Sequence, residues 1–572
     1  MSDAIRIEAG AWSRPDRGRL IQYGLSLVTV IAVAAPILPI LAQSFMDRPL
    51  YEPGREFTLG NYVRLVSGGD MARLAGNTLL FAGGTTVFAT LIGVVFAILV
   101  GRTNLPGRRI FGAISLWPMF LSSLIFVLGW VIIYGPAGYF TLMGRTQLGY
   151  APWTLYSLTG MVLVAGVSQA PITFLYCVAS TALSDATLED AARSSGAGPL
   201  RTLRSVTLPL LLPSILYSAV LNFTSALEML AIPLVLGGNG RVELFTTYLY
   251  NKGYAALRPD YGVVSTAAVF LIGVIWLLLF LQNRLLRNNK RFVTVGGKAS
   301  RPRMLDLGWL RWPVAFVLAL YCLFLILLPT GALVLRASVT VLSPLVPFWK
   351  MFTPNQFIAV FASESNLRAI YNTLVISALG AVIGTVFVAL VAIVVHRSDF
   401  RFRRQLEYVA LFPRAVPGLV AGMGFVYAMF LIPPLGMLRD TIWVLLVAYV
   451  MRYIPLAFGA ISPAILQISS ELDNSARTLG ADWWTTSWAI VMKLIRPALF
   501  SSGALLFIFF LKEYTVAVFL FTPGSEVIGA LLLNAWDRGQ MGLLAAFASV
   551  QIGMTILFLL VARVALGVKV HG

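Results

Sequence analysis

Long apolar stretches alternate with short polar segments along the whole chain. The stretches fall at residues 22–43, 75–100, 110–134, 155–183, 208–236 and 263–283, and again at 312–335, 371–395, 406–432, 442–466, 497–521 and 542–567. A helix of about 20 apolar residues crosses the hydrocarbon core of a bilayer, whereas the strands of a membrane barrel are shorter and alternate in polarity. The pattern therefore predicts an all-α polytopic membrane protein with about twelve transmembrane helices.

The second six stretches repeat the first six. Asn77 and Asn372 open matching stretches 295 positions apart, and Pro171 and Pro455 lie at matching places 284 positions apart. Parallel repeats related by an axis along the membrane normal are one way in which transporters are built. We therefore expect two tandem six-helix domains, residues 1–283 and 311–572, related by a pseudo-twofold axis and joined by a basic linker at 284–310.

A charged segment between the fourth and fifth stretches of each half is also repeated. Residues 189–213 read EDAARSSGAGPLRTLRSVTLPLLLP, and residues 473–497 read DNSARTLGADWWTTSWAIVMKLIRP. Identical residues 284 positions apart include Ala192 and Ala476, Arg193 and Arg477, Gly196 and Gly480, and Pro213 and Pro497. A polar element repeated outside the membrane suggests two equivalent docking points for a partner.

Charge gives the orientation. The chain is 58% hydrophobic and 12% charged, and its net charge is +19. The basic residues cluster in short loops beside the apolar stretches, which is the positive-inside pattern rather than a nucleic-acid surface. They include Arg102, Arg108 and Arg109 after the second stretch and Arg397, Arg401, Arg403 and Arg404 after the eighth. These loops, the linker, the repeated segments and both termini are thus predicted to be cytoplasmic.

The residues of redox and metal chemistry are scarce. Cys177 and Cys322 both lie in apolar stretches, so no disulfide framework is expected, and the chain has only two histidines. The alternative of a membrane-embedded enzyme would need a convergent set of histidines, cysteines or acids, and the sequence offers no such set. We expect no catalytic residue and no metal bound by this chain.

The repeated segment resembles the EAA motif of the membrane subunits of binding-protein-dependent ABC importers. That motif is E-A-A, three residues, Gly, nine residues, an aliphatic residue, any residue, Leu and Pro. The first copy fills it with Asp190-Ala191-Ala192, Gly196 and Val206-Thr207-Leu208-Pro209. The second copy keeps Ala476, Gly480 and the aliphatic Ile490 but has Asn474 in place of the acid and lacks Leu-Pro.

The resemblance implies two fused permease domains with the type I ABC importer fold in a bacterial inner membrane. Each repeated segment, at 184–207 and 468–496, would form a short coupling helix that docks on a cytosolic ABC ATPase homodimer. The residues implied in this coupling are Glu189, Asp190, Ala192, Arg193 and Gly196, and Asp473, Asn474, Ala476, Arg477 and Gly480. The chain has no G-x-x-x-x-G-K-[ST] loop, so ATP and magnesium are expected on the partner ATPase. A periplasmic substrate-binding protein would deliver the solute.

Ionisable residues inside apolar stretches are expensive and mark candidate pathways. Glu228 and Glu513 lie 285 positions apart, and we expect them to face each other across the pseudo-twofold axis as a polar, cation-tolerant path. The polar residues that accompany them are Asn222, Gln169, Arg452 and Tyr453. The alternative is that these groups satisfy one another between helices or cap a break in a helix.

The solute is indicated by resemblance alone. Fused permeases of this length, and the segments at 236–240 and 521–529, are similar to those of ferric-iron importers, which implies ferric iron. Related permeases carry 2-aminoethylphosphonate, polyamines or thiamine, and these remain alternatives. A secondary transporter driven by an ion gradient is a further alternative, although it gives no reason for a repeated polar segment.

Overall fold

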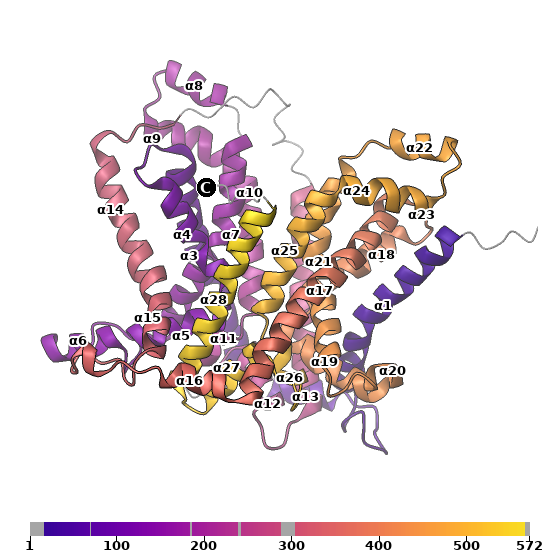
Figure 1. Ribbon diagram of the computed structural model, residues 1–572, viewed down its shortest axis with the longest axis horizontal. Coiled ribbons are helices and arrows are strands. Elements are labelled where there is room, and N and C mark those ends of the chain that lie inside the picture. The colour runs from indigo at the N-terminus through magenta and orange to yellow at the C-terminus, as the bar shows by residue number, and fades with distance from the viewer. Residues whose placement is uncertain (1–16, 69, 184–185, 238–241, 288–303, 567–572) are drawn as a thin grey trace, which may run out of the picture.

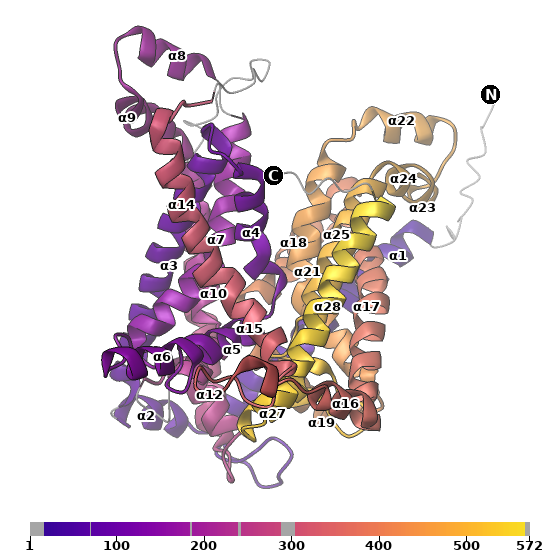
Figure 2. The ribbon, with the colours of Figure 1, turned by 60° about the vertical axis from the view of Figure 1, so that its left-hand side comes forward.

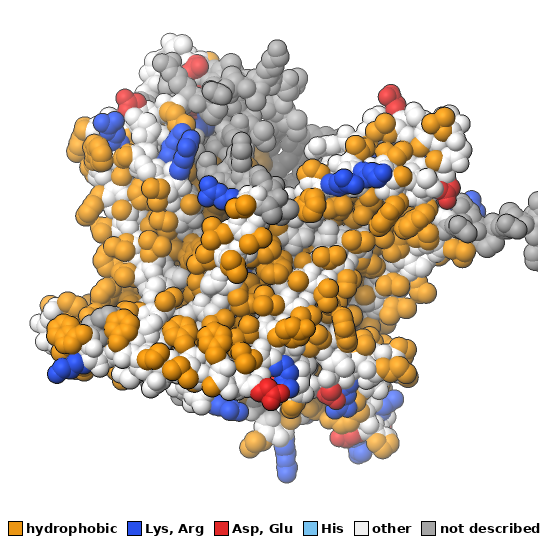
Figure 3. Space-filling model, in the orientation of Figure 1, with side chains coloured by type: hydrophobic (Ala, Val, Ile, Leu, Met, Phe, Trp, Pro, Cys, Tyr) orange, Lys and Arg blue, Asp and Glu red, His pale blue; other side chains and the backbone are white. Residues whose placement is uncertain are grey.

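The computed structural model describes residues 17–68, 70–183, 186–237, 242–287 and 304–566. Ten of the described helices are long and apolar enough to cross a membrane, and up to twelve spans result if each of two sharply bent helix pairs counts as one. On the face that Figure 3 shows, apolar side chains cover the middle and charged side chains gather toward the two ends. The all-α polytopic fold is thereby confirmed.

The helices fall into two series that follow the sequence repeat. The first series is α1 (Arg17–Ser44), α2 (Gly60–Ser67), α3 (Asp70–Arg102), α4 (Arg108–Phe120), α5 (Ser123–Tyr134), α6 (Tyr139–Leu148), α7 (Leu158–Leu183), α8 (Ala186–Ser194), α9 (Pro199–Thr202), α10 (Leu208–Leu227), α11 (Ala231–Leu236), α12 (Phe245–Gly253) and α13 (Tyr261–Arg287). A π-helical turn, Leu203–Thr207, joins α9 to α10.

The second series begins after the linker. It consists of α14 (Arg311–Tyr321), α15 (Leu328–Ala337), α16 (Asn355–Ala362), α17 (Glu364–Arg397), α18 (Arg403–Leu411), α19 (Gly418–Leu431), α20 (Pro433–Gly436), α21 (Ile442–Leu466), α22 (Glu471–Thr478), α23 (Trp483–Thr486), α24 (Met492–Leu494), α25 (Arg496–Leu511), α26 (Ala517–Leu520), α27 (Ile528–Asp537) and α28 (Met541–Leu566). Its π-helical turn, Ser487–Val491, lies 284 positions after the first one.

Two groups of helices lean apart at one end of the molecule and meet at the other (Figures 1 and 2). The group with α3, α4, α7 and α10 forms one side, and the group with α17, α18, α21 and α25 forms the other. The repeated polar segments, α8 and α22, lie at the end where the groups are apart. We call this the motif end, and the other the opposite end.

The first helix of each half packs on the other half. Helix α1 contacts α19, and α15 contacts α5, so that α1 stands with the second group and α14 with the first (Figure 2). The contacts are close because glycines face them. A Cβ on Gly424 would lie 2.0 Å from the carbonyl oxygen of Pro36, and a Cβ on Gly129 would lie 2.2 Å from that of Pro329. The halves therefore complete each other.

Four of the expected spans are interrupted. The stretch at 110–134 is divided between α4 and α5, and the stretch at 406–432 bends by 111° between α18 and α19. The stretches at 208–236 and 497–521 stop at Leu227 and Leu511 before short helices α11 and α26. Broken backbone at membrane depth frees carbonyl and N–H groups, so it persists only where protein or a cavity satisfies them. The four breaks place unpaired backbone groups where the two halves meet.

The end of the linker is attached to the first half, and residues 288–303 lie outside the described residues. The Leu305 N–H donates to the carbonyl of Arg102 at 2.7 Å, and the Asn104 amide donates to the Asp306 carboxylate at 2.6 Å. Hydrogen bonds from the Gly308 N–H and the Asn104 side chain lower the pKa of the Asp306 carboxyl. Helix α14 therefore begins from a fixed point on the first half.

Candidate functional site

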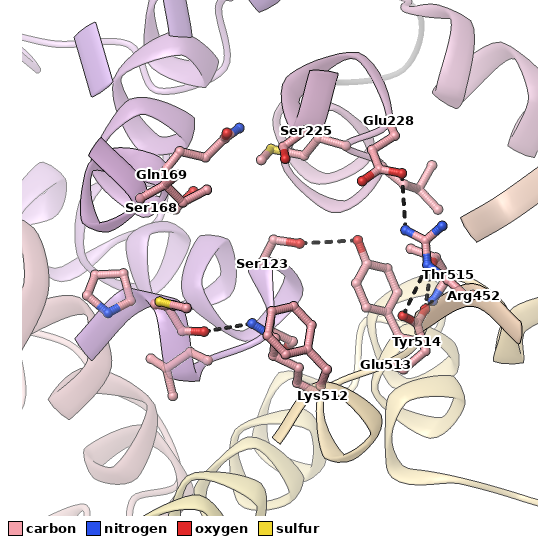
Figure 4. A pocket seen from close by; sticks show the side chains of 18 of the residues that line it. Ser123, Ser168, Gln169, Ser225, Glu228, Arg452, Lys512, Glu513, Tyr514 and Thr515 are labelled. Atoms are coloured by element: carbon pink, nitrogen blue, oxygen red, sulfur yellow. Dashed lines mark hydrogen bonds and ion pairs between the residues drawn. The ribbon is translucent and has the colours of Figure 1, made fainter. Parts of the chain in front are cut away.

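A cavity of about 250 Å³ lies where the interrupted helices of the two halves meet (Figure 4). Its lining includes Met119, Ser123, Gln169, Ser225, Glu228, Arg452, Tyr453, Lys512, Glu513 and Thr515. A second cavity, of about 500 Å³, is lined by Tyr176, Tyr217, Pro413, Leu456 and others. Glu228, Arg452, Tyr453 and Phe509 line both. The charged side chains thus stand between two hollows at the interface of the halves.

Arg452 of α21 joins the two halves electrostatically. Its guanidinium lies 3.1 Å from the carboxylate of Glu228, which caps α10, and 3.6 Å from that of Glu513. The same guanidinium donates to the carbonyl of Val416 at 2.9 Å, in the break between α18 and α19. The three charged side chains are 14%, 29% and 4% exposed, in the order Arg452, Glu228, Glu513. The Arg452 guanidinium therefore pairs with two carboxylates and also binds one backbone carbonyl that the helix break leaves without a partner.

Glu513 holds the break between α25 and α26. Its Oε1 accepts hydrogen bonds from the Thr515 N–H at 2.8 Å and the Val516 N–H at 3.1 Å, and also from the Thr515 hydroxyl. Its Oε2 accepts from the Tyr453 hydroxyl. The first N–H groups of a helix have no partner within that helix, so a carboxylate at this place satisfies donors that would otherwise be unpaired in the membrane.

Lys512 of the second half binds backbone at a helix break in the first half. Its Nζ donates at 2.6 Å to the carbonyl of Met119, in the last turn of α4 just before the break, and lies 4.3 Å from the centre of the Phe509 ring. In Figure 4 it points toward the first half and away from Glu513. Because a carbonyl in the membrane interior needs a donor, this lysine stabilises the first half's break from the second half.

The helix ends correct the expected pairing of the two acids. Glu228 caps α10 with its N–H on Thr224, and Lys512 caps α25 with its N–H on Ile508. Both pairs are 284 positions apart, so the structural counterpart of Glu228 is Lys512, and Glu513 lies one residue further on. The expectation that the two carboxylates occupy matched positions is therefore wrong, although both approach the Arg452 guanidinium, one from each half. Two acids and two cations are present instead, and the alternative that these groups satisfy one another describes the cluster.

The repeated segments form the expected helices, α8 and α22, at the motif end. Gly196 and Gly480 have φ of +83° and +84° and lie two residues after the helix ends. The carbonyls of Ala192 and Ala476 accept from the N–H of the residue after each glycine at 3.0 Å. A left-handed residue closes a helix in this way, and glycine adopts it without a Cβ penalty. The two glycines are therefore matched stops.

Several of the predicted docking residues on α8 and α22 are exposed to solvent. Asp190 and Asn474 are exposed at matched positions, and Arg477 is exposed and lies 3.6 Å from the carboxylate of Asp399. The side chain of Arg193 lies outside the described residues. Their use in docking stays a prediction.

Glu189 and Asp473, by contrast, turn inward. Glu189 lies 3.4 Å from Arg102, and Asp473 lies 2.7 Å from Arg397. Sequence reasoning grouped the two acids with the docking residues and assigned the two arginines to the positive-inside charges. The signal that could have found them is the spacing, because Arg102 and Arg397 are 295 positions apart, as are Asn77 and Asn372.

Comparison with protein families decides the class of the molecule. Residues 89–295 and 383–568 each match one family, described as the binding-protein-dependent transport system inner membrane component. The two matches cover more than half of the chain. The chain belongs to this family. The two tandem permease domains and the multi-pass inner-membrane location follow from this membership and from the apolar helices.

Individual relatives extend the comparison. The permease is 27% identical over 539 residues to the ferric transport system permease protein FbpB of Actinobacillus pleuropneumoniae, covering 92% of this chain and 75% of that one. It is 26% identical to a provisionally named ferric transport system permease protein of Haemophilus influenzae, FbpB 1, and the match covers 88% of this chain and 77% of that one. A provisionally named 2-aminoethylphosphonate permease protein, PhnV of Salmonella paratyphi A, matches at 26% over 30% of this chain and 63% of its own length.

Of the two predicted pathway amides, Gln169 lines the cavity of about 250 Å³, whereas Asn222 is fully buried and is not among the residues that line it. Asn222 of α10 donates to the Thr173 hydroxyl at 2.9 Å. Gln169 of α7 is 4% exposed, and both of its amide atoms are buried without a hydrogen-bond partner in the described part of the chain. Figure 4 shows its amide on the cavity wall near Ser225. Among the described residues, no three His, Cys, Asp or Glu side chains group closely enough to hold a metal ion.

Proposed function

We propose that this permease passes a small solute, delivered by a periplasmic binding protein, through the interface of its two halves, and that an ATPase drives the passage. The observation that carries the proposal is the pair of matched helices, α8 and α22, one on each of the two helix groups at the motif end. A dimeric ATPase has two equivalent faces, and each helix offers one of them a partner. The polar cluster lies between the same two groups.

The proposal fixes an orientation. The motif end and both termini face the cytoplasm, where a homodimeric ABC ATPase docks on α8 and α22 and holds ATP and magnesium. The binding protein docks at the opposite end. Energy enters as movement of the two helix groups relative to each other, which is the rigid-body kind of transition that alternating access requires.

The polar cluster is the barrier that this movement opens. Arg452 holds Glu228 of the other half at 3.1 Å between the two cavities. A solute that crosses from one cavity to the other must pass this pair, so the halves must separate there. When they separate, Glu513 keeps the buried Arg452 paired within the second half, and Glu228, the more exposed of the two acids at 29%, is left facing the opened passage.

Ferric iron is the solute that we propose. Three relatives named for ferric transport match 84–92% of this chain, whereas the 2-aminoethylphosphonate relative matches 30%. We assign the selection of the metal to the binding protein, and the permease then supplies a passage for it. 2-Aminoethylphosphonate, polyamines and thiamine are the other solutes to test.

The test is ATP hydrolysis in proteoliposomes that hold this chain and its candidate ATPase. The binding protein is added empty or loaded in turn with ferric iron, 2-aminoethylphosphonate, polyamine or thiamine. Stimulation by the iron-loaded form alone is the expected result. Stimulation by another loaded form supports the importer function but shows that the solute is not ferric iron. Uptake driven by an ion gradient, with no stimulation by any form, overturns the proposal in favour of a secondary transporter.

A further inference from the structure

Each motif helix is tied to the end of a membrane helix by a matched ion pair. Arg102 is the last residue of α3, and its guanidinium lies 3.4 Å from the Glu189 carboxylate of α8. Arg397 is the last residue of α17, and its guanidinium lies 2.7 Å from the Asp473 carboxylate of α22. The arginines keep the 295-residue offset of the early helices, and the acids keep the 284-residue offset of the motif. The arrangement has thus been kept in both halves.

Both pairs are shielded from water. The side chains of Arg102 and Glu189 are 1% and 5% exposed, and those of Arg397 and Asp473 are 9% and 17% exposed. Exposed ion pairs contribute little, because water and salt screen them, whereas removing one partner of a buried pair leaves a desolvated charge. The Arg477–Asp399 pair on the same helix α22 is 52% and 88% exposed and belongs to the screened kind. The two inward-facing pairs are therefore the ones whose loss would leave a desolvated charge.

Each pair also contacts a segment of the chain next to its motif helix, after the helix in the first half and on both sides of it in the second. In the first half, the Thr207 hydroxyl, at the π-helical turn before α10, donates to Glu189 at 2.9 Å. In the second half, Arg397 donates to the carbonyl of Ile465 near the end of α21 at 3.0 Å. The Trp483 indole, just after the motif glycine, donates to the carbonyl of Arg397 at 2.9 Å. The contacts therefore join α3, α8 and the π-helical turn in the first half, and α17, α21, α22 and α23 in the second.

The tied helices lead to the polar cluster. Helix α3 packs on α7 and α10, which carry Gln169 and Glu228, and α17 packs on α21 and α25, which carry Arg452 and Lys512. We propose that Arg102 and Arg397 are positioning residues that transmit displacement of α8 and α22 to α3 and α17, and so to the cluster. The proposal rests on the proposed function, because it takes the ATPase as the source of displacement.

The second half offers a clean test. Asp473→Asn removes the charge that faces Arg397 and keeps the size of the side chain. Glu471→Gln is the matched control, because Glu471 lies on the same helix, is exposed, and loses the same charge. Asp473→Glu is the conservative rescue, since the first half uses glutamate at the matched position. All three are made in the full chain and reconstituted in nanodiscs.

The first readout needs no ATPase. Hydrogen exchange of the α22 amides is expected to rise by about tenfold in Asp473→Asn, a factor that corresponds to about 1.4 kcal/mol. Exchange in Glu471→Gln and Asp473→Glu is expected to stay near that of the unmodified chain. Equal exchange in Asp473→Asn and Glu471→Gln would overturn the tie itself.

The second readout is the amount of solute imported per ATP hydrolysed in proteoliposomes. It is expected to fall severalfold in Asp473→Asn, while the ATPase still co-purifies, and to recover in Asp473→Glu. If exchange rises but this ratio matches that of Glu471→Gln, the tie is structural and its role in transmission is overturned. If the unmodified chain binds no ATPase, the proposed function and the transmission both fail, whereas the exchange result still decides the tie.

Discussion

Gly424 of α19 lies so close to Pro36 of α1 that a methyl group on its Cα would come within 2.0 Å of the proline carbonyl oxygen. The matched contact, Gly129 against Pro329, is 2.2 Å by the same measure. Backbones approach this closely in membranes where small residues remove the side chain between them. At these two contacts, α1 of the first half packs on α19 of the second, and α15 of the second half packs on α5 of the first.

Gly424→Ala is expected to push α1 away from the second half. Overpacking of this kind destabilises by about 1–3 kcal/mol, because neither backbone can yield easily. The measurement is the thermal unfolding midpoint of the purified chain in detergent. Gly273→Ala in α13 is the control, since no atom lies within 4 Å of the position that its new Cβ would take. Equal midpoints for the two variants would show that the close contact does not form.

Glu513→Gln is expected to damage the permease more than Glu228→Gln. Glu513 is 4% exposed and holds the α25–α26 break, whereas Glu228 is 29% exposed and pairs with Arg452 alone among the contacts described. We expect a loss of roughly 3 kcal/mol for the first change and about 1 kcal/mol for the second. Unfolding midpoints and solute uptake measure both. The reverse order would assign the structural role to Glu228.

Lys512→Met is expected to destabilise the interface of the halves by about 1–3 kcal/mol, because it leaves the Met119 carbonyl without its donor in the membrane interior. Lys512→Gln keeps an N–H donor and is expected to lose less. Lys252→Met, at an exposed position of α12, controls for the loss of one positive charge. Thermal unfolding compares the three. A Lys512→Met protein as stable as the Lys252→Met protein would contradict the bridging role.

Gly480→Ala is expected to weaken the stop of α22, since a residue with a Cβ at φ +84° costs about 1–2 kcal/mol. No atom lies within 4 Å of the position a Cβ would take, so only the backbone conformation is tested. Asn tolerates this conformation, and Gly480→Asn is the control. Co-purification with the ATPase is expected to fall for Ala and to persist for Asn. Identical behaviour of the two would mean that the left-handed stop is not needed for docking.

The repeat and the motif helices could be predicted because their signals are local. Apolar length predicts spans, and a glycine after a short charged segment predicts a helix stop, whatever the rest of the chain does. The breaks near Pro118 and Pro413 escaped prediction because apolar character continues across them. A hydropathy pattern records where a segment lies, and it does not record whether its backbone is continuous there.

The contents of the site were predicted better than their arrangement. Glu228, Arg452, Tyr453 and Glu513 do meet, because ionisable groups buried in a membrane must find partners. Their pairing depends on where each helix ends, and one residue of difference replaces Glu513 with Lys512 as the counterpart of Glu228. The exchange of first helices is a tertiary property, and no segment of the sequence carries it alone.

The exchanged first helices also set an order of assembly at the ribosome. Helix α1 is made several hundred residues before α19, on which it packs. During that interval α1 can pack on α13 of its own half, while the face that later contacts α19 stays exposed to lipid. The first half likewise remains open until α15 arrives. Neither half is a complete folding unit before the other is translated. In a chain that stalls in the linker, the surface of α5 on which α15 packs would stay uncovered, within reach of the membrane's quality-control proteases.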